Sequence, residues 1–202
     1  MADTNQLLQM LSGDPRFGAL AALCDEYSEP ERLAAIRSLS KPDMAKLYER
    51  AAGQPAVSLS YLVPADAAPN TSVPWVGKNS LPVASAFTKV FTRVEGNEAL
   101  VGRNVGAMEW LIGPGYYACT VRPGSPGEFL VDYTREPDVA PKGWPPVKKN
   151  SRGASYVVFH NMHDYLRPVG KNVAIGAAYD GPTGKFKNQY FILARTQATV
   201  AT

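Results

Sequence analysis

The chain has 202 residues, of which 45% are hydrophobic and 19% charged, and its 21 basic and 18 acidic residues give a formal net charge of +3. This length suits one sizeable hydrophobic core with an appendage rather than two full domains. The 17 glycines and 17 prolines are too many for an all-helical bundle, and two cysteines exclude a disulfide scaffold. The small net charge argues against a strongly electrostatic nucleic-acid binder, so we expect no nucleic-acid partner.

The sequence indicates neither export nor a membrane span. Residues 1–8 lack the basic and apolar regions of a secretory signal. The uncharged stretches fall far short of the roughly 20 residues that a membrane-spanning helix needs. We therefore expect a cytoplasmic protein without membrane insertion, in which Cys24 and Cys119 are reduced and buried.

Residues 1–53 are predicted to be a helical N-terminal region, because apolar residues recur at helical spacing. Asp14 and Pro15 resemble an N-cap followed by the first helical residue. Ser28 and Glu31 have the spacing of a capping box, and Ser40 is a candidate cap for a further helix. These helices are short, so we expect them to cover an edge or an open end of a larger β structure.

Residues 54–202 are predicted to form a β-barrel body that begins with a Pro-rich segment at 54–85. This segment contains five prolines and reads as a long connection that wraps the body, with one strand over 57–63 where the residues alternate. The loop over 135–150 carries Trp144 and several lysines. We expect it to be solvated, with a lid at the barrel mouth as the alternative.

From Phe87 onward, alternating residue types predict β-strands. The expected strands cover residues 87–93, 100–111, 116–122, 128–134, 155–162, 173–179 and 188–195. Short connections between them favour antiparallel neighbours. Because an open sheet would leave two exposed edges, we expect about seven or eight strands to close into an antiparallel β-barrel, with an open sheet covered by the helices as the alternative.

Several motifs over about residues 73–197 resemble those of bacterial GXWXG-type proteins. They are Trp75-x-Gly77, Leu81-Pro82, Lys89-x-Phe91, Arg152-Gly153 with Ser155, Asp164-x-x-Arg167-x-Val169, Val173-x-Ile175-Gly176-x-x-x-Asp180 and Tyr190-Phe191-x-Leu193-x-Arg195. Val73 stands where that family's signature has its first glycine. The resemblance implies a lipocalin-like (calycin-like) barrel and a small apolar ligand, and it assigns no catalytic residue.

The sequence contains no motif for a metal or a nucleotide cofactor. The two histidines, His160 and His163, are three positions apart, which in the expected strand places them on opposite faces. HExxH, paired-cysteine, GxSxG and P-loop patterns are all missing. We therefore expect neither a metal site nor a cofactor.

Some polar residues lie within apolar strand segments. If they point into the barrel, desolvation shifts their pKa values and makes them acid or base candidates. Simple alternation places Lys89 and Glu109 towards water, whereas for His160 and Asp132 neither face is favoured. The aromatic residues in the strands either line a pocket, with hydroxyl groups as polar contacts, or are ordinary core.

Three hypotheses for the function follow. The first is a lipocalin-like barrel that binds a small hydrophobic molecule, with Tyr117, Tyr133, Tyr156, Trp110 and Lys89 as candidate contacts. The second is a cofactor-independent isomerase, cyclase or dehydratase, in which His160, Asp132 or Glu109 serve as catalytic acid and base in the same cavity. The third is a scaffold that acts through its helical N-terminus, and the sequence leaves a homo-oligomer open.

Overall fold

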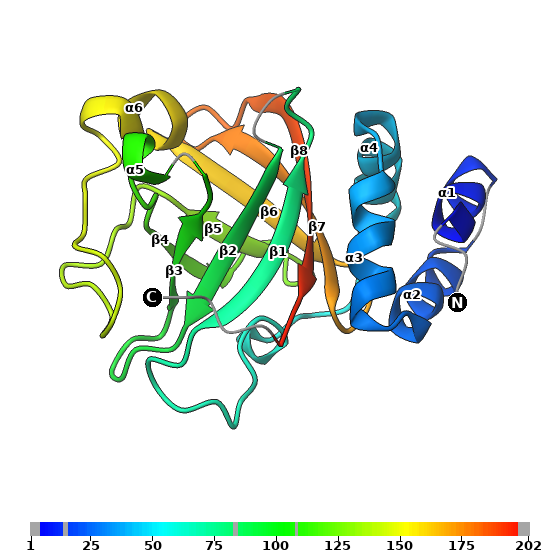
Figure 1. Cartoon of the computed structure of the whole chain (residues 1–202), viewed down its shortest axis with the longest axis horizontal. Helices are drawn as coiled ribbons and strands as arrows, with labels where there is room; N and C mark the ends of the chain where they lie inside the picture. Colours follow the sequence, from blue (N-terminus) through cyan, green and yellow to red (C-terminus); the bar gives the residue numbers. More distant parts are fainter. Residues whose placement is uncertain (1–4, 14–15, 83–84, 108, 198–202) are drawn as a thin grey trace.

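Eight antiparallel strands form a closed barrel in the computed structural model, which describes residues 5–13, 16–82, 85–107 and 109–197 (Figure 1). The strands are β1 (Val73–Asn79), β2 (Ala86–Thr92), β3 (Leu100–Val105), β4 (Tyr117–Val121), β5 (Phe129–Asp132), β6 (Met162–Pro168), β7 (Val173–Asp180) and β8 (Phe186–Arg195). Each strand pairs with its neighbours in sequence, and β8 also pairs with β1, so these eight strands have no free edge. The expected closed antiparallel barrel is confirmed, and the open sheet is wrong.

Two different parts of the chain cover the two ends of the barrel. One end, here called the plugged end, is filled by residues 54–72, which include the 3-10 helix η1 (Leu59–Tyr61). There the Trp75 indole donates a hydrogen bond to the Leu62 carbonyl at 3.1 Å. At the opposite end lie two short helices, α5 (Glu109–Ile112) and α6 (Gly153–Phe159), which we call the lid (Figure 1).

The strand expected over residues 57–63 is wrong, because these residues contain η1 and fill the plugged end. β1 begins instead at Val73, inside the segment that was expected to be a connection. Pro74 explains this error, because a proline cannot donate to a strand ladder and therefore argues against a strand.

Both lid helices lie in segments that were expected to be β-strands. β3 ends at Val105, and the residues that were expected to extend it include α5; Met108, within that expected strand, lies outside the described residues. The strand expected over 155–162 is also wrong, since α6 ends at Phe159 and β6 starts only at Met162. A short apolar run does not distinguish a buried strand from a buried helix by its periodicity. The positive φ values at the two ends of this segment, +59° at Gly153, the first residue of α6, and +53° at Asn161, just after the helix, mark the turns that separate α6 from the neighbouring chain.

Glycines make room for the aromatic side chains that fill the barrel. The Tyr117 ring lies so close to Gly102 that an added Cβ would be 2.0 Å from its Cε2 atom. In the same way, a Cβ on Gly176 would be 2.2 Å from Cζ of Phe191. Both rings therefore lie flat on the inner wall, which explains glycine at two strand positions where it is otherwise unfavourable.

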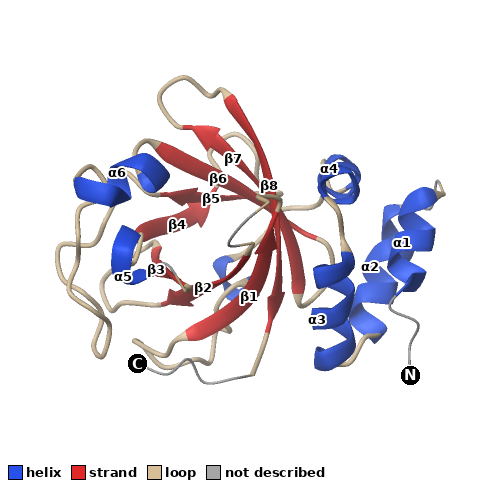
Figure 2. Cartoon of the chain, turned by 45° about the horizontal axis from the view of Figure 1, so that its top comes forward, coloured by secondary structure: helices blue, strands red, loops and turns tan. Residues whose placement is uncertain are grey.

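Four helices pack on the outside of the barrel wall (Figure 2). They are α1 (Asn5–Ser12), α2 (Phe17–Glu26), α3 (Glu29–Ser38) and α4 (Lys41–Arg50). The capping box expected at Ser28 and the cap expected at Ser40 are confirmed, whereas Asp14 and Pro15 lie outside the described residues. Of the four, α3 and α4 contact the outer face of β7 and β8, and α1 packs on the other helices. The expectation that the helices cover an edge or an open end is therefore wrong. None of the described helices is long and apolar enough to cross a membrane.

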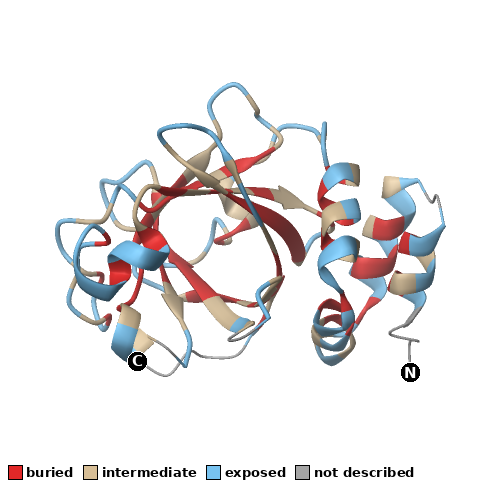
Figure 3. Cartoon of the chain, turned by 90° about the horizontal axis from the view of Figure 1, so that it is seen from above, coloured by how far each residue is buried: buried red, intermediate tan, exposed pale blue. Residues whose placement is uncertain are grey.

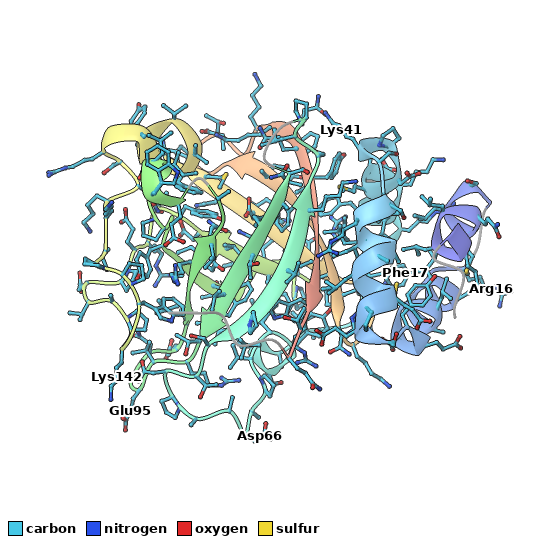
Figure 4. All side chains as sticks on the ribbon, in the orientation of Figure 1. Arg16, Phe17, Lys41, Asp66, Glu95 and Lys142 are labelled. Atoms are coloured by element: carbon cyan, nitrogen blue, oxygen red, sulfur yellow. The ribbon has the colours of Figure 1, made fainter. Side chains whose placement is uncertain are left out.

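The loop between β5 and α6 lies on the outer wall of the barrel rather than across its mouth. Trp144 packs on Tyr116, with ring centroids 6.0 Å apart. Lys142 of the same loop lies at the same end of the molecule as Glu95 and Asp66, which is the plugged end (Figure 4). The interpretation of this loop as a lid is therefore wrong, because α5 and α6 occupy that place.

Candidate functional site

A buried lysine is the centre of the candidate site. Lys89 of β2 is only 2% exposed, so the expectation that it faces water is wrong. Its Nζ lies 3.0 Å from Oδ2 of Asp164, and it donates hydrogen bonds to the Tyr133 hydroxyl and to Oδ1 of Asn104, the latter at 3.2 Å. We call these four residues the Lys89 cluster. They bring one amine, one carboxylate, one phenol and one amide together inside the barrel.

The strand register explains why the Lys89 cluster forms. Lys89 pairs directly with Asn104 across β2 and β3, so both side chains point to the same face. Asp164 pairs with Val131 across β5 and β6, and Tyr133 follows two positions later on the same face. Closure of the barrel then places these two pairs opposite each other across the interior.

Aromatic rings surround the Lys89 amine. Its Nζ lies 4.8 Å from the ring centroid of Tyr117, 4.9 Å from that of Tyr133 and 5.2 Å from that of Phe191. A cation over aromatic faces gains electrostatic attraction that offsets part of the hydration lost on burial. The site therefore combines apolar walls with a small number of polar groups, which is the usual composition of a small-molecule site.

Burial shifts the pKa values of the cluster in defined directions. Loss of hydration lowers the pKa of Lys89 and raises the pKa of Asp164, and the attraction between the two groups offsets part of each shift. Burial also raises the pKa values of Tyr117 and Tyr133 well above the ordinary tyrosine value, so both phenols keep their protons. The cluster can thus donate hydrogen bonds from Lys89 and Tyr133 and accept them at Asp164.

The lid covers the Lys89 cluster with one aromatic side chain. Phe159, at the end of α6, stacks on Tyr133 with ring centroids 5.2 Å apart and an interplanar angle of 6°. The two lid helices are joined by a hydrogen bond of 2.5 Å from the Ser155 hydroxyl to the Ile112 carbonyl. Phe159 therefore lies between the polar cluster and the outer surface of the lid.

The five expected ligand contacts lie in two different places. Tyr117, Tyr133 and Lys89 meet inside the barrel. Trp110 and Tyr156 lie on the lid, where the Trp110 side chain is 77% exposed and that of Tyr156 also faces solvent. The structure thus brings three of these residues together and leaves two on the surface.

The three candidate catalytic residues do not meet. His160 follows α6 and stacks on Tyr156, with ring centroids 4.2 Å apart. Asp132 is on the outer face of β5, with Oδ1 3.2 Å from Nε2 of His163. Glu109 lies on α5 and forms an ion pair with Arg103 at 2.6 Å, on the outer wall. The expectation that the two histidines share a strand is also wrong, because only His163 lies in one.

Asn104 and Asp164 were not among the predicted site residues. Asp164 lies beyond the strand expected at 155–162, whereas the structure places it within β6. The alternation of Met162, Asp164 and Leu166, all three buried, is the signal that identifies its inward direction. Asn104 could have been found as the residue that faces Lys89 on the next strand.

Both cysteines are buried, at Cys24 of α2 and Cys119 of β4. Burial raises the pKa of the Cys24 thiol to about 12 and raises that of Cys119 as well. Since the thiolate is the reactive form, we expect neither thiol to react with DTNB in the native protein, and both to react in guanidinium chloride. Rapid reaction of one thiol per molecule of native protein, seen as released thionitrobenzoate, would contradict this prediction.

Two hollows lie outside the barrel. One, of about 730 Å³, is lined by residues that include Arg32, Asn172 and Arg195, and the other, of about 530 Å³, lies between α2 and the start of the plug, at Phe17 and Pro55. No residue of the Lys89 cluster lines either hollow. Within the described ranges, no three His, Cys, Asp or Glu side chains are grouped so that they could hold a metal ion. The Lys89 cluster and these two hollows are therefore at different places in the molecule.

Comparison with known proteins adds little to this geometry. No family model matches the chain, and no curated protein matches it. Among solved structures, it is similar to the crystal structure of a mutant of the vaccine antigen transferrin binding protein B from Actinobacillus pleuropneumoniae H49, with 9% sequence identity and a TM-score of 0.29. The match covers 64% of this chain and 62% of the other. The similarity to GXWXG-type proteins stays a prediction that rests on the motifs alone.

Proposed function

We propose that this protein binds a small, largely apolar molecule inside the barrel and that a polar group of the ligand bonds to the Lys89 cluster. The observation that carries the proposal is the buried pair of Lys89 and Asp164, held among aromatic rings directly beneath the lid. A carbonyl, hydroxyl or carboxyl group is the matching ligand chemistry, because its oxygen can accept a hydrogen bond from Lys89 or Tyr133 in place of one of their present partners.

A purely structural role does not account for the cluster well. Replacing a buried ion pair by apolar side chains of similar volume is often neutral or stabilising. A barrel of eight strands is wide enough either for its own side chains or for one small ligand. Retaining an amine and a carboxylate there favours a role in recognition, and buried groups with shifted pKa values concentrate at functional sites.

The ligand reaches the cluster through the lid. Phe159 is the aromatic residue that α6 places over Tyr133, so we infer that the ligand takes the position of this ring when the lid moves outward. The plugged end is less suitable, because Tyr61 there bonds to the Gly170 carbonyl at 2.8 Å and stacks on Phe129.

The positions of the candidate catalytic residues do not favour the isomerase, cyclase or dehydratase. His160 and Glu109 lie on or beside the lid, and Asp132 lies on the outer wall. No second function is therefore proposed. The cytoplasmic location and a homo-oligomer stay predictions from the sequence.

The proposal is tested by native mass spectrometry and by titration with the apolar probe anilinonaphthalene sulfonate. We expect the purified protein to retain a small molecule, and Lys89→Met to lose it. We also expect Lys89→Met to bind the probe about 10- to 150-fold more weakly, since a hydrogen bond to a charged group contributes about 1.5–3 kcal/mol. The matched control is Lys187→Met, which removes the same charge from an exposed position of β8.

The double variant Lys89→Met/Asp164→Leu separates recognition from folding. It removes both buried charges, so we expect it to fold and still to bind the probe weakly. Equal probe affinity in Lys89→Met, Lys187→Met and the wild type would rule out the proposed site.

A further inference from the structure

Both helices of the lid have residues exposed to solvent (Figure 3), and several of the exposed side chains are apolar. Five large apolar side chains are exposed there, and we call them the lid patch: Trp110, Leu111, Tyr156, Val157 and Val158. Val157 is the most exposed of them, at 85%. Leu81, in the turn between β1 and β2 at the same end of the barrel, is exposed too. Among the described residues, six of the seven exposed large apolar side chains therefore belong to this end of the molecule. Exposed apolar side chains that gather at one end of a molecule are typical of a binding surface.

Basic residues lie along the same end. Residues 148–159 contain three basic residues and no acidic one. Lys148 and Arg152 are exposed, whereas Lys149 forms an ion pair with Glu136 at 3.7 Å. Lys148 packs beside the end of α5, since its Cδ lies 3.5 Å from where a Cβ on Gly113 would be. The carboxylate on α5 is neutralised by its ion pair with Arg103. The lid patch is thus apolar at its centre and positive at its border.

The opposite end of the barrel has a different character. The turn between β2 and β3 contains Glu95 and Glu98, and the plug contributes Asp66. Glu95 and Asp66 project from that end (Figure 4). Most of the exposed large apolar side chains therefore lie at the lid end, and the plugged end carries acidic side chains beside Lys142.

We propose that the lid patch docks on the surface of an anionic lipid bilayer and that the apolar ligand passes between the bilayer and the barrel there. This inference rests on the proposed function. Tryptophan and tyrosine suit the boundary between headgroups and acyl chains, because each has an apolar ring and a polar atom. Lysine and arginine beside them are attracted to anionic headgroups.

Two features favour a bilayer over a second copy of this chain. A symmetric pair formed through the lid patch would place the basic borders of the two copies against each other, and like charges repel. The patch also continues into the proposed ligand route, because the helix that exposes Val157 is the helix that places Phe159 over Tyr133. Docking at this face therefore places the bilayer, which holds the apolar ligand, directly against the lid.

Docking is measured with the full chain and vesicles of phosphatidylcholine alone or mixed with phosphatidylglycerol. We expect the protein to sediment with the mixed vesicles at low salt and to be released by high salt. Trp75 and Trp144 are buried, whereas Trp110 is exposed, so brominated phospholipids are expected to quench the Trp110 emission on docking.

Two matched variants test the patch itself. Val157→Asp places a charge at its centre, whereas Val139→Asp makes the same change at a residue that is 81% exposed in the outer-wall loop. We expect Val157→Asp to weaken vesicle binding by about tenfold or more and Val139→Asp to leave it unchanged. Both positions are exposed, so neither variant is expected to impair folding.

The outcomes separate docking from ligand binding. Val157→Asp is expected to keep its affinity for anilinonaphthalene sulfonate in solution, and Lys89→Met is expected to keep its vesicle binding. No sedimentation with anionic vesicles, or equal loss in Val157→Asp and Val139→Asp, would overturn the docking proposal. A dimer seen by light scattering that Val157→Asp dissociates would also overturn it, by assigning the lid patch to a second copy.

Discussion

Lys89→Met is expected to lower the free energy of unfolding by about 3–5 kcal/mol, because it leaves the Asp164 carboxylate buried without its cation. Lys89→Met/Asp164→Leu removes both charges and is expected to be as stable as the wild type, or more stable by about 1–4 kcal/mol. Denaturant unfolding followed by circular dichroism measures both values. The exposed Lys187→Met serves as control and is expected to change stability by less than about 0.5 kcal/mol.

The deficit of Lys89→Met is expected to depend on pH. Burial already raises the pKa of Asp164 above its ordinary value of 3.8, and loss of the Lys89 cation raises it further. The folded state thus binds a proton more tightly than the unfolded state. The stability gained from this protonation is fully present below the pKa that Asp164 has in the unfolded chain. It is lost as the pH rises through the pKa that Asp164 has in the folded protein. The stability difference from the wild type should therefore be smaller near pH 4 than near pH 8.

This result distinguishes a buried charge from a simple packing defect. A cavity or a clash left by methionine would produce a deficit that does not change with pH and that Asp164→Leu does not correct. If the double variant were less stable than Lys89→Met, the two charges would not be the source of the effect.

Gly102→Ala is expected to lower the free energy of unfolding by about 1–3 kcal/mol, because the new methyl group collides with the Tyr117 ring. The Tyr117 ring cannot retreat freely, since it contacts the Tyr133 ring with centroids 5.2 Å apart and its hydroxyl donates to the Val90 carbonyl at 3.2 Å. Any shift is therefore transmitted to the Lys89 cluster, so we also expect weaker probe binding.

Gly18→Ala is the control for this substitution. Gly18 lies in α2, is exposed, and has no atom within 4 Å of an added Cβ. There alanine improves helix propensity and is expected to raise stability by up to about 1 kcal/mol. Thermal unfolding of the two variants under the same conditions measures the contrast, and a Gly102→Ala protein as stable as the wild type would show that the Tyr117 ring does not need this glycine.

Local sequence patterns were sufficient for most of the barrel wall. Alternation identified the strands that contain Lys89, Tyr117, Val131 and Ile175, because each lies between clear turns and carries β-favouring residues. The capping box at Ser28 was predicted for a similar reason, since its partners are three residues apart.

The same patterns were insufficient where a segment's structure depends on distant contacts. The run Tyr156–Phe159 contains residues that favour strands, but Phe159 packs on Tyr133 and Ser155 bonds to α5, and these contacts stabilise a helix. Asp164 was missed as a result, because the next strand was placed too early in the chain.

The sequence by itself favoured an antiparallel barrel with N-terminal helices over an open sheet, because alternation and short connections depend only on neighbouring residues. Only the tertiary structure decided which side of each strand faces inward. A strand has two faces, and a shift of one residue exchanges them. Closure of the barrel therefore decides that Lys89 points inward. It also brings Lys89 to Asp164, which lies 75 residues later in the chain. Closure of the barrel thus places Lys89, which alternation predicted to face water, at the centre of the candidate site.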